Sequence, residues 1–271
     1  MSKLRYVKTT EQIARARQSN PEFLESSVRS LRFVYETDPE IAAALVPRPL
    51  EVDPASHICV TFSHVAIHLS PDFTFEIGSA IFGVKVRYDG TSGIYLVTMP
   101  MTTEQAVVPG RETFGEPKKI AAIDFRKDGE RASCEVTRMG MTYLEGKGRV
   151  GGALGAREFV EYGFCYKALP ACEKSRAFDV EPLLVRLEWR HRHKGAWKLE
   201  DAELNLYDSP FDPVSDVPVR RIVTAQYEEG TAESNGRVLR NVPGEWLEPF
   251  LHQRYDDTSG DGIEVGTGAA A

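Results

Sequence analysis

Short runs of β-branched and aromatic residues, separated by turn residues, constrain the fold of this chain more than any other feature. Residues 57–69 alternate between apolar and polar side chains, and residues 78–101 form two such runs around Asp89-Gly90. Alternation with a period of two places one face of a strand toward a core. An Asp-Gly pair between apolar runs is typical of a tight β-hairpin. Comparable runs occupy residues 31–37, 131–145, 182–193, 197–208 and 219–229.

Few segments have the pattern of a helix. Residues 39–47 start with a proline and end at the next one, which predicts a short helix, and a second helix is predicted at 243–255. Many short strands and few helices favour a β-rich fold, all-β to α+β. Its core is expected to be an antiparallel β-barrel, cone or sandwich with a few peripheral helices.

The predicted organisation is one folded domain with polar ends. Residues 1–28 form a polar, helix-prone extension, residues 29–256 form the domain, and the small polar residues of 257–271 predict a disordered tail. Turn-rich breaks are expected at 146–155 and 209–218. The glycines of the first break favour a flexible flap over a phosphate-binding loop, because the usual Lys-Ser/Thr ending is absent.

Charge and composition exclude several classes of partner. The chain has 271 residues, of which 40 are acidic and 33 are basic, giving a formal net charge of −7. Such a chain has no general attraction for nucleic acid or for an anionic membrane. No apolar stretch is long enough for a membrane helix, and the N-terminus lacks the apolar core of a signal peptide. Four sparse cysteines without CxxC spacing predict free thiols in a reducing cytoplasm.

Residues 110–119 contain the pattern with the most chemistry. Lys118 and Lys119 follow Pro117 and lie between two apolar runs, 106–108 and 120–123. If those runs belong to the core, at least one ammonium group is drawn toward the interior. Burial and a neighbouring cation both disfavour the charged form of lysine. The resulting neutral amine could attack a ketone and form an imine.

The order Arg111-Glu112, then Pro117-Lys118-Lys119, resembles the active-site motif of the acetoacetate decarboxylase family. That family's enzyme is the standard example of a lysine activated by desolvation or by a neighbouring cation. The resemblance makes Lys118 the imine-forming residue and Lys119 its cationic neighbour. It covers residues 30 to 225 approximately, with matching segments at 34–38, 46–51, 75–80, 138–140, 206–208 and 213–219.

The resemblance also implies roles for other residues. Glu76 would orient the substrate or move protons, and Arg29 would hold the substrate carboxylate. Arg32 is the alternative, and either arginine matches the family's arginine only after a small shift in alignment. Arg111 and Glu112 are also substrate-binding candidates, and the alternative is that they only pair with each other and orient the loop. Further substrate-binding candidates are Phe114, Met139 and Tyr255, the last as a proton donor. The resemblance implies a small keto-acid substrate, no cofactor and a homo-oligomer.

The histidines do not suggest a metal site. His191 and His193 fall in a basic run, Arg-His-Arg-His-Lys, which is interpreted as an exposed strand end. His64 and His68 have the spacing of a zinc-binding helix, but the surrounding sequence alternates like a strand. No metal ligation is therefore predicted.

Four departures from the family pattern leave the reaction open. The family's decarboxylases carry a second acidic residue where this chain reads Val60-Thr61-Phe62-Ser63-His64, and Glu116 replaces an apolar residue before the proline. The ungapped match to the family's first arginine is Val28, and segment 146–164 is longer. Three functions remain: decarboxylation of a β-keto acid, a pyruvate aldolase-dehydratase with an aldehyde co-substrate, and a non-catalytic protein that binds small carboxylates.

Overall fold

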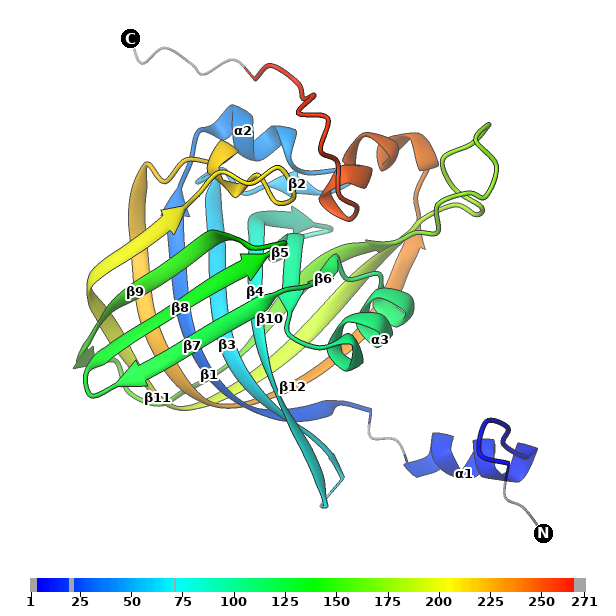
Figure 1. Ribbon diagram of the computed structural model, residues 1–271, viewed down its shortest axis with the longest axis horizontal. Helices are drawn as coiled ribbons and strands as arrows, with labels where there is room; N and C mark the ends of the chain where they lie inside the picture. Colours follow the sequence, from blue (N-terminus) through cyan, green and yellow to red (C-terminus); the bar gives the residue numbers. More distant parts are fainter. Residues whose placement is uncertain (1–3, 20–21, 71, 266–271) are drawn as a thin grey trace.

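One sheet dominates the structure. The computed structural model describes residues 4–19, 22–70 and 72–265, and within them twelve strands form a single mixed sheet (Figure 1). The predicted β-rich fold class with few helices is confirmed. The strands are β1 (Leu24–Glu36), β2 (Glu51–Val52), β3 (His57–Ser70), β4 (Phe73–Tyr88), β5 (Thr91–Met101), β6 (Lys118–Ile120), β7 (Ala122–Asp128), β8 (Arg131–Arg138), β9 (Met141–Ala153), β10 (Arg157–Lys167), β11 (Leu183–Leu206) and β12 (Arg221–Asn241).

Pairing at two edges closes part of this sheet into a ring. β10 runs antiparallel to β11 along its whole length, and it also pairs in parallel with β5, where Gly163 lies opposite Ile94. The order β5-β4-β3-β1-β12-β11-β10 therefore returns to its starting strand. β9, β8 and β7 continue from the far half of β11. The predicted hairpin at Asp89-Gly90 joins β4 to β5, with positive φ at both residues.

The strands of the ring have two different faces. On β1, Leu31 and Phe33 are fully buried against the face that β7–β9 cover, and they belong to the main hydrophobic core. The alternate residues Ser30 and Arg32 face a cavity on the other side. Alternation along one strand thus supplies residues to a dry core on one side and to the cavity wall on the other.

The glycine-rich segment near residue 150 is a strand rather than the predicted turn-rich break and flap. It forms most of β9, which pairs with both β8 and β11. Gly146 crosses close to the aromatic core, because a Cβ atom there would lie 2.5 Å from the Phe62 ring and 2.7 Å from the Phe33 ring. The glycine is needed for this close approach rather than for flexibility. The chain turns only at Leu154–Ala156, between β9 and β10.

The helices are short and peripheral. They are α1 (Thr10–Ser19), α2 (Pro39–Ala44), α3 (Glu104–Phe114) and the 3₁₀ turns η1 (Val214–Asp216), η2 (Gly244–Trp246) and η3 (Glu248–Gln253). α2 confirms the helix predicted at 39–47, while the region 243–255 forms 3₁₀ turns. None of the helices in the described part of the chain is long and apolar enough to cross a membrane.

The predicted ends of the domain need adjustment. β1 starts at Leu24, inside the predicted extension, and α1 lies before it. Residues 257–265 have no regular structure, while residues 1–3, 20–21 and 266–271 lie outside the described part. The four cysteines are free, and three of them are buried.

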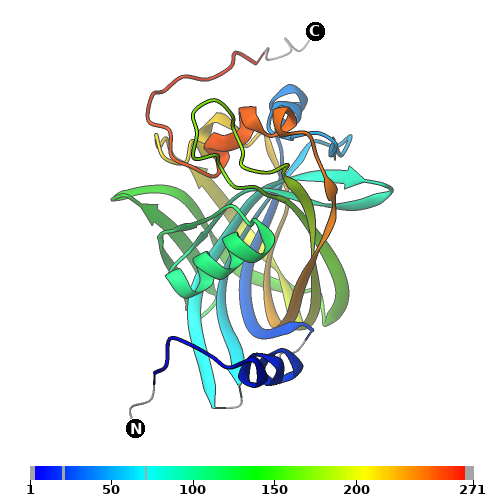
Figure 2. The ribbon, with the colours of Figure 1, turned by 90° about the vertical axis from the view of Figure 1, so that its right-hand side faces the viewer.

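α3 was not predicted, because Pro109 and Gly110 interrupt its helical pattern. It nevertheless lies beside the ring, against β5, β6, β10 and β12 (Figure 2). Ala106, Val107 and Gly110 are its buried residues. Tertiary packing therefore outweighs the weak helix propensity.

We expect Gly146→Ala to destabilise the fold by about 1–3 kcal/mol, the usual cost of overpacking a core. Gly152→Ala is the matched control, because a Cβ atom at Gly152, on the same strand, has no other atom within 4 Å. Urea denaturation of both variants measures the difference in the free energy of unfolding. Equal stabilities would show that β9 does not pack against Phe33 and Phe62.

Candidate active site

The turn after α3 places Lys118. α3 ends at Phe114, and Gly115 adopts a left-handed conformation with φ of 79°. A Cβ atom at Gly115 would lie 2.3 Å from the Cα atom of Lys167, so only glycine fits between α3 and β10. After Pro117 the chain enters β6, which pairs in parallel with β5 and sets Lys118 opposite Met99.

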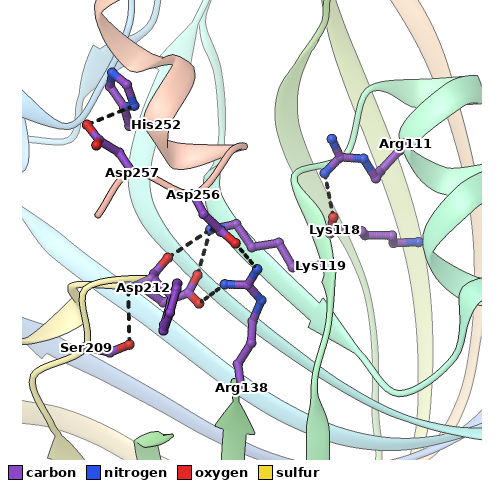
Figure 3. A network of polar contacts seen from close by, with 10 residues as sticks. Arg111, Lys118, Lys119, Arg138, Ser209, Asp212, His252, Asp256 and Asp257 are labelled. Atoms are coloured by element: carbon purple, nitrogen blue, oxygen red, sulfur yellow. Dashed lines mark hydrogen bonds and ion pairs between the residues drawn. The ribbon is translucent and has the colours of Figure 1, made fainter. Parts of the chain in front are cut away.

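Strand geometry separates the two adjacent lysines. Figure 3 shows the Lys118 and Lys119 side chains pointing in opposite directions from β6, as alternate residues of a strand do. Lys119 Nζ lies 2.8 Å from Asp212 Oδ1 and 3.4 Å from Asp256 Oδ1. Arg138 Nη1 binds the other oxygen of Asp212 at 2.9 Å. Lys119 therefore belongs to an ion-pair network that ties β6 and β8 to the C-terminal segment, and the structure does not bring it to Lys118 as a cationic neighbour.

Lys118 is paired with an acid instead. Its Nζ atom lies 2.8 Å from Glu116 Oε2, and the two side chains are only 12% and 8% exposed. Gly110 of α3 makes room for the pair, because a Cβ atom there would lie 2.2 Å from Glu116 Oε2 and 2.5 Å from Lys118 Nζ. The amine and the carboxylate are therefore held together against the helix in a largely dry setting.

This pair lines one large cavity. The cavity has a volume of about 660 Å³, within the range of small-molecule sites. Its walls come from the inward faces of the ring strands and from α3. They are mainly apolar and include Val65, Ile77, Ile81, Met99, Met101, Phe114, Leu187 and Trp189.

Of the predicted residues around Lys118, Phe114 lines the cavity and Arg111 supports it from outside. Arg111 Nη1 donates a hydrogen bond to the Lys118 carbonyl oxygen at 2.7 Å. Its guanidinium also lies over the Tyr255 ring, 5.4 Å from the ring centre. Burial lowers the pKa of Arg111, and nearby Arg254 adds to this effect. Glu112 is exposed and does not reach the cavity.

Three other candidates are either exposed or absent from the cavity lining. The Glu76 carboxylate is 69% exposed and lies 3.4 Å from His64 Nε2, although Glu76 borders the cavity. Its side chain alternates with those of Phe75 and Ile77, which face inward. Met139 is 66% exposed in the turn between β8 and β9. Tyr255 contacts Arg111 but is not a lining residue.

The choice between the two arginines of β1 is resolved. Arg29 is exposed, and its Nη2 atom lies 3.3 Å from His64 Nδ1. Arg32 faces the cavity, but both of its terminal nitrogens bind the Glu161 carboxylate at 2.7 Å. This contact crosses the inside of the ring from β1 to β10. Burial alone would lower the pKa of Arg32, but the buried carboxylates of Glu161 and Glu228 raise it above its usual value.

His191 and His193 are not at an exposed strand end, and that interpretation is wrong. Their side chains are only 14% and 5% exposed, and both line the cavity beside Glu228. Phe159 stacks on His191 at 4.7 Å between ring centres. Burial lowers the pKa of His193 to about 4. Both histidines therefore belong to a second polar cluster that sequence analysis missed.

A sequence signal for this cluster was present. Leu187, Trp189, His191 and His193 fall on one face of β11, and the charged residues 188, 190, 192 and 194 fall on the other. Because the face that carries the two histidines begins with the apolar Leu187 and Trp189, the pattern indicates that this face points inward. Glu116, Glu161 and Glu228 carried no comparable signal, because their partners come from other elements.

Comparison with known proteins supports the family resemblance. The family model described as "Acetoacetate decarboxylase (ADC)" matches residues 8–242. The acetoacetate decarboxylase of Burkholderia vietnamiensis is 30% identical over 208 residues, covering 71% of this chain and 78% of the relative. That of Clostridium beijerinckii is 28% identical over 213 residues, covering 73% and 79%.

Solved structures share the fold. The acetoacetate decarboxylase of Legionella pneumophila aligns with a TM-score of 0.67 at 19% identity, covering 82% of this chain and 88% of the other. The enduracididine biosynthesis enzyme MppR, in complex with pyruvate, aligns with a TM-score of 0.69 at 15% identity, covering 82% and 92%. At these identities the likeness concerns the fold.

We expect His193 to make the stability of the protein depend on pH. Its pKa is lowered from 6.5 to about 4 by burial, so its contribution to stability is complete above pH 6.5 and is lost as pH falls toward 4. The loss is at most roughly 3 kcal/mol. Urea denaturation at pH 7, 5.5 and 4.5 should show a shallower decline for His193→Gln than for the native protein.

His64→Ala is the control for this prediction, because His64 lies on β3 outside the cavity lining. Carboxylates also titrate in this pH range, but they do so in the native protein and in both variants. If His193→Gln and the native protein decline in parallel, His193 is not held neutral by burial.

Proposed function

Because the chain belongs to the acetoacetate decarboxylase family, we propose that it is a lyase that decarboxylates a β-keto acid through an imine on Lys118. The observation that carries this proposal is the buried pair of Lys118 and Glu116 in the wall of an apolar cavity. The family resemblance further supports a homo-oligomer and a reaction without a cofactor.

In this mechanism Glu116 accepts a proton from the Lys118 ammonium group and leaves a neutral amine. The Nζ lone pair attacks the substrate carbonyl carbon, and loss of water gives a protonated imine. The bond between the α-carbon and the carboxylate then breaks and CO₂ leaves. The electron pair of that bond becomes the carbon–carbon double bond of an enamine, and the π electrons of the iminium move onto its nitrogen. Protonation of the resulting enamine carbon and hydrolysis release the ketone and the amine. Glu116, 2.8 Å from Nζ, is placed to return the proton.

The polarity of the cavity favours the loss of CO₂. Among the described lining residues, the lysine and arginine side chains are Lys118 and Arg32, and the terminal nitrogens of Arg32 are bound by Glu161. A substrate carboxylate would therefore lie against apolar walls with the iminium as its counter-charge. Both charges vanish as CO₂ leaves, so an apolar site stabilises the transition state relative to the bound acid. In this proposal the carboxylate-binding role predicted for Arg29 is not needed.

Aldol chemistry is the second candidate, and the size of the cavity favours it. A volume of about 660 Å³ leaves ample room for an aldehyde beside a pyruvate imine. Glu116 would then remove a methyl proton from the imine, and the enamine carbon would attack the aldehyde. Residues 60–64 carry no carboxylate of their own, although Thr61 lines the cavity, and this departure from the decarboxylase pattern fits the alternative as well.

We expect borohydride to trap acetoacetate or pyruvate on Lys118, because reduction makes the imine bond permanent. Peptide mass mapping identifies the modified lysine. Lys118→Ala should give no adduct and lose turnover by at least a thousandfold, about 4 kcal/mol of activation free energy. Lys119→Arg is the matched control, because it removes the second amine and keeps the cation that Asp212 binds.

The two candidates differ in their products. Release of CO₂ from acetoacetate supports the decarboxylase, whereas consumption of pyruvate with an aromatic aldehyde supports the aldolase. A folded protein that gives no adduct with either keto acid would leave only the non-catalytic carboxylate-binding protein. An adduct on Lys119 in place of Lys118 would show that the nucleophile is misassigned.

A further inference from the structure

The cavity has a second polar end that the proposed mechanism does not use. One end holds Lys118 and Glu116, close to Cys165 of β10. Burial raises the pKa of Cys165, and the nearby charges of Glu116 and Lys118 make smaller, opposite contributions to it. The other end holds the Arg32–Glu161 pair and the two histidines. Cys165 and Glu161 lie four residues apart on β10, which corresponds to about 13 Å along a strand.

Apolar walls connect the two ends. Leu187 and Trp189 precede His191 on the inward face of β11, and Met99 lies opposite Lys118 on β5. Acetoacetate or pyruvate, once attached to Lys118, would occupy only the first end. A single ligand that fills a cavity of about 660 Å³ is an extended molecule with an apolar middle.

The far end contains polar atoms that lack partners. His191 Nδ1 and Nε2, His193 Nδ1 and Arg32 Nε are buried and form no hydrogen bond. The nearest carboxylate oxygens to His191 Nε2 and His193 Nδ1 are 3.7 Å away, beyond hydrogen-bond distance. Buried polar groups without partners are costly, so these atoms indicate a place where a ligand completes the network.

Charge at this end favours a neutral ligand group. Arg32 is matched by Glu161, and Arg157 contacts Glu228, so the two cations and two anions cancel. The lowered pKa of His193 leaves its imidazole neutral at neutral pH. A ligand carboxylate here would be repelled by Glu161 and Glu228 and would find no unpaired cation. A ligand ammonium group would be repelled by two arginines whose carboxylate partners are already engaged.

A hydroxyl group suits the remaining atoms best. A neutral imidazole has one nitrogen that donates and one that accepts, and a hydroxyl can do both. Resting on the proposed function, we infer that the substrate is an extended keto acid with an apolar, aromatic-sized middle and a terminal hydroxyl group that hydrogen-bonds to His191 and His193. The hydroxyl would favour the binding of long substrates, because a ligand without it leaves the buried histidine nitrogens unpaired.

Two product-like ketones test this inference by calorimetry. They are 4-(4-hydroxyphenyl)butan-2-one and 4-phenylbutan-2-one, which differ only in the terminal hydroxyl. We expect the native protein to bind the hydroxylated ketone at least tenfold more tightly. Lys118→Ala cannot form an imine, yet it should keep the same ratio, because the hydroxyl acts at the far end.

Three histidine variants locate the effect. His193→Phe should reduce the affinity ratio to near one, whereas His193→Gln, which keeps a hydrogen-bonding side chain, should retain part of it. His64→Ala should leave the ratio unchanged, since His64 is not a lining residue. Thermal unfolding of each variant confirms that the ligands meet a folded protein.

The outcomes separate this inference from the proposed function. A ratio near one in the native protein and in Lys118→Ala overturns the hydroxyl site, whether or not borohydride traps Lys118. A tenfold ratio that survives in both proteins but not in His193→Phe supports the hydroxyl site, even if no adduct forms. A ratio that persists in His193→Phe would place the hydroxyl elsewhere and contradict the inference.

Discussion

The alternation of side chains across shared strands is the constraint on which this structure depends. β1 sends Phe33 into a dry core and Arg32 into the cavity, so the same strand serves stability and binding. β6 repeats this division in only three residues, with Lys118 inward and Lys119 outward. A shift of one residue in the pairing of β6 with β5 would exchange the two lysines. The parallel register at Met99, fixed by the turn through Gly115, therefore decides which amine faces the cavity.

The two lysines meet different electrostatic settings. Lys119 lies among Asp212, Asp256 and Arg138, which form an ion-pair network with it. Lys118 has one carboxylate at 2.8 Å and apolar walls beyond it. In such a setting the ion pair has lost much of the solvation that water would give to both charges. The proposed chemistry thus depends on the one acid at the amine, Glu116, rather than on two adjacent ammonium groups.

Sequence analysis predicted the features that depend on local pattern. The Asp89-Gly90 hairpin, the β-rich class and the segment carrying Lys118 follow from short-range signals. It failed where packing partners are distant in sequence. Gly146 was interpreted as a turn residue because its contacts with Phe33 and Phe62 are invisible in the local sequence. Pro109 interrupts the helical pattern of α3, so that helix was not predicted. The arginines beside His191 made the segment look exposed, so the inward direction of the histidine face of β11 was missed.

The paired arginine has a consequence for specificity. A free guanidinium at Arg32 would attract every small anion, including carboxylates that cannot react. Glu161 removes that attraction by occupying both terminal nitrogens, and the contact also braces β1 against β10 across the ring. The cavity must then select its ligand by shape and by neutral hydrogen bonds, which discriminate by leaving buried groups unpaired when the wrong molecule binds. In the proposed function, an apolar cavity with a neutral polar end would therefore have two effects: it would favour the loss of charge at Lys118, and it would bind ligands that reach the histidines more tightly than short ones.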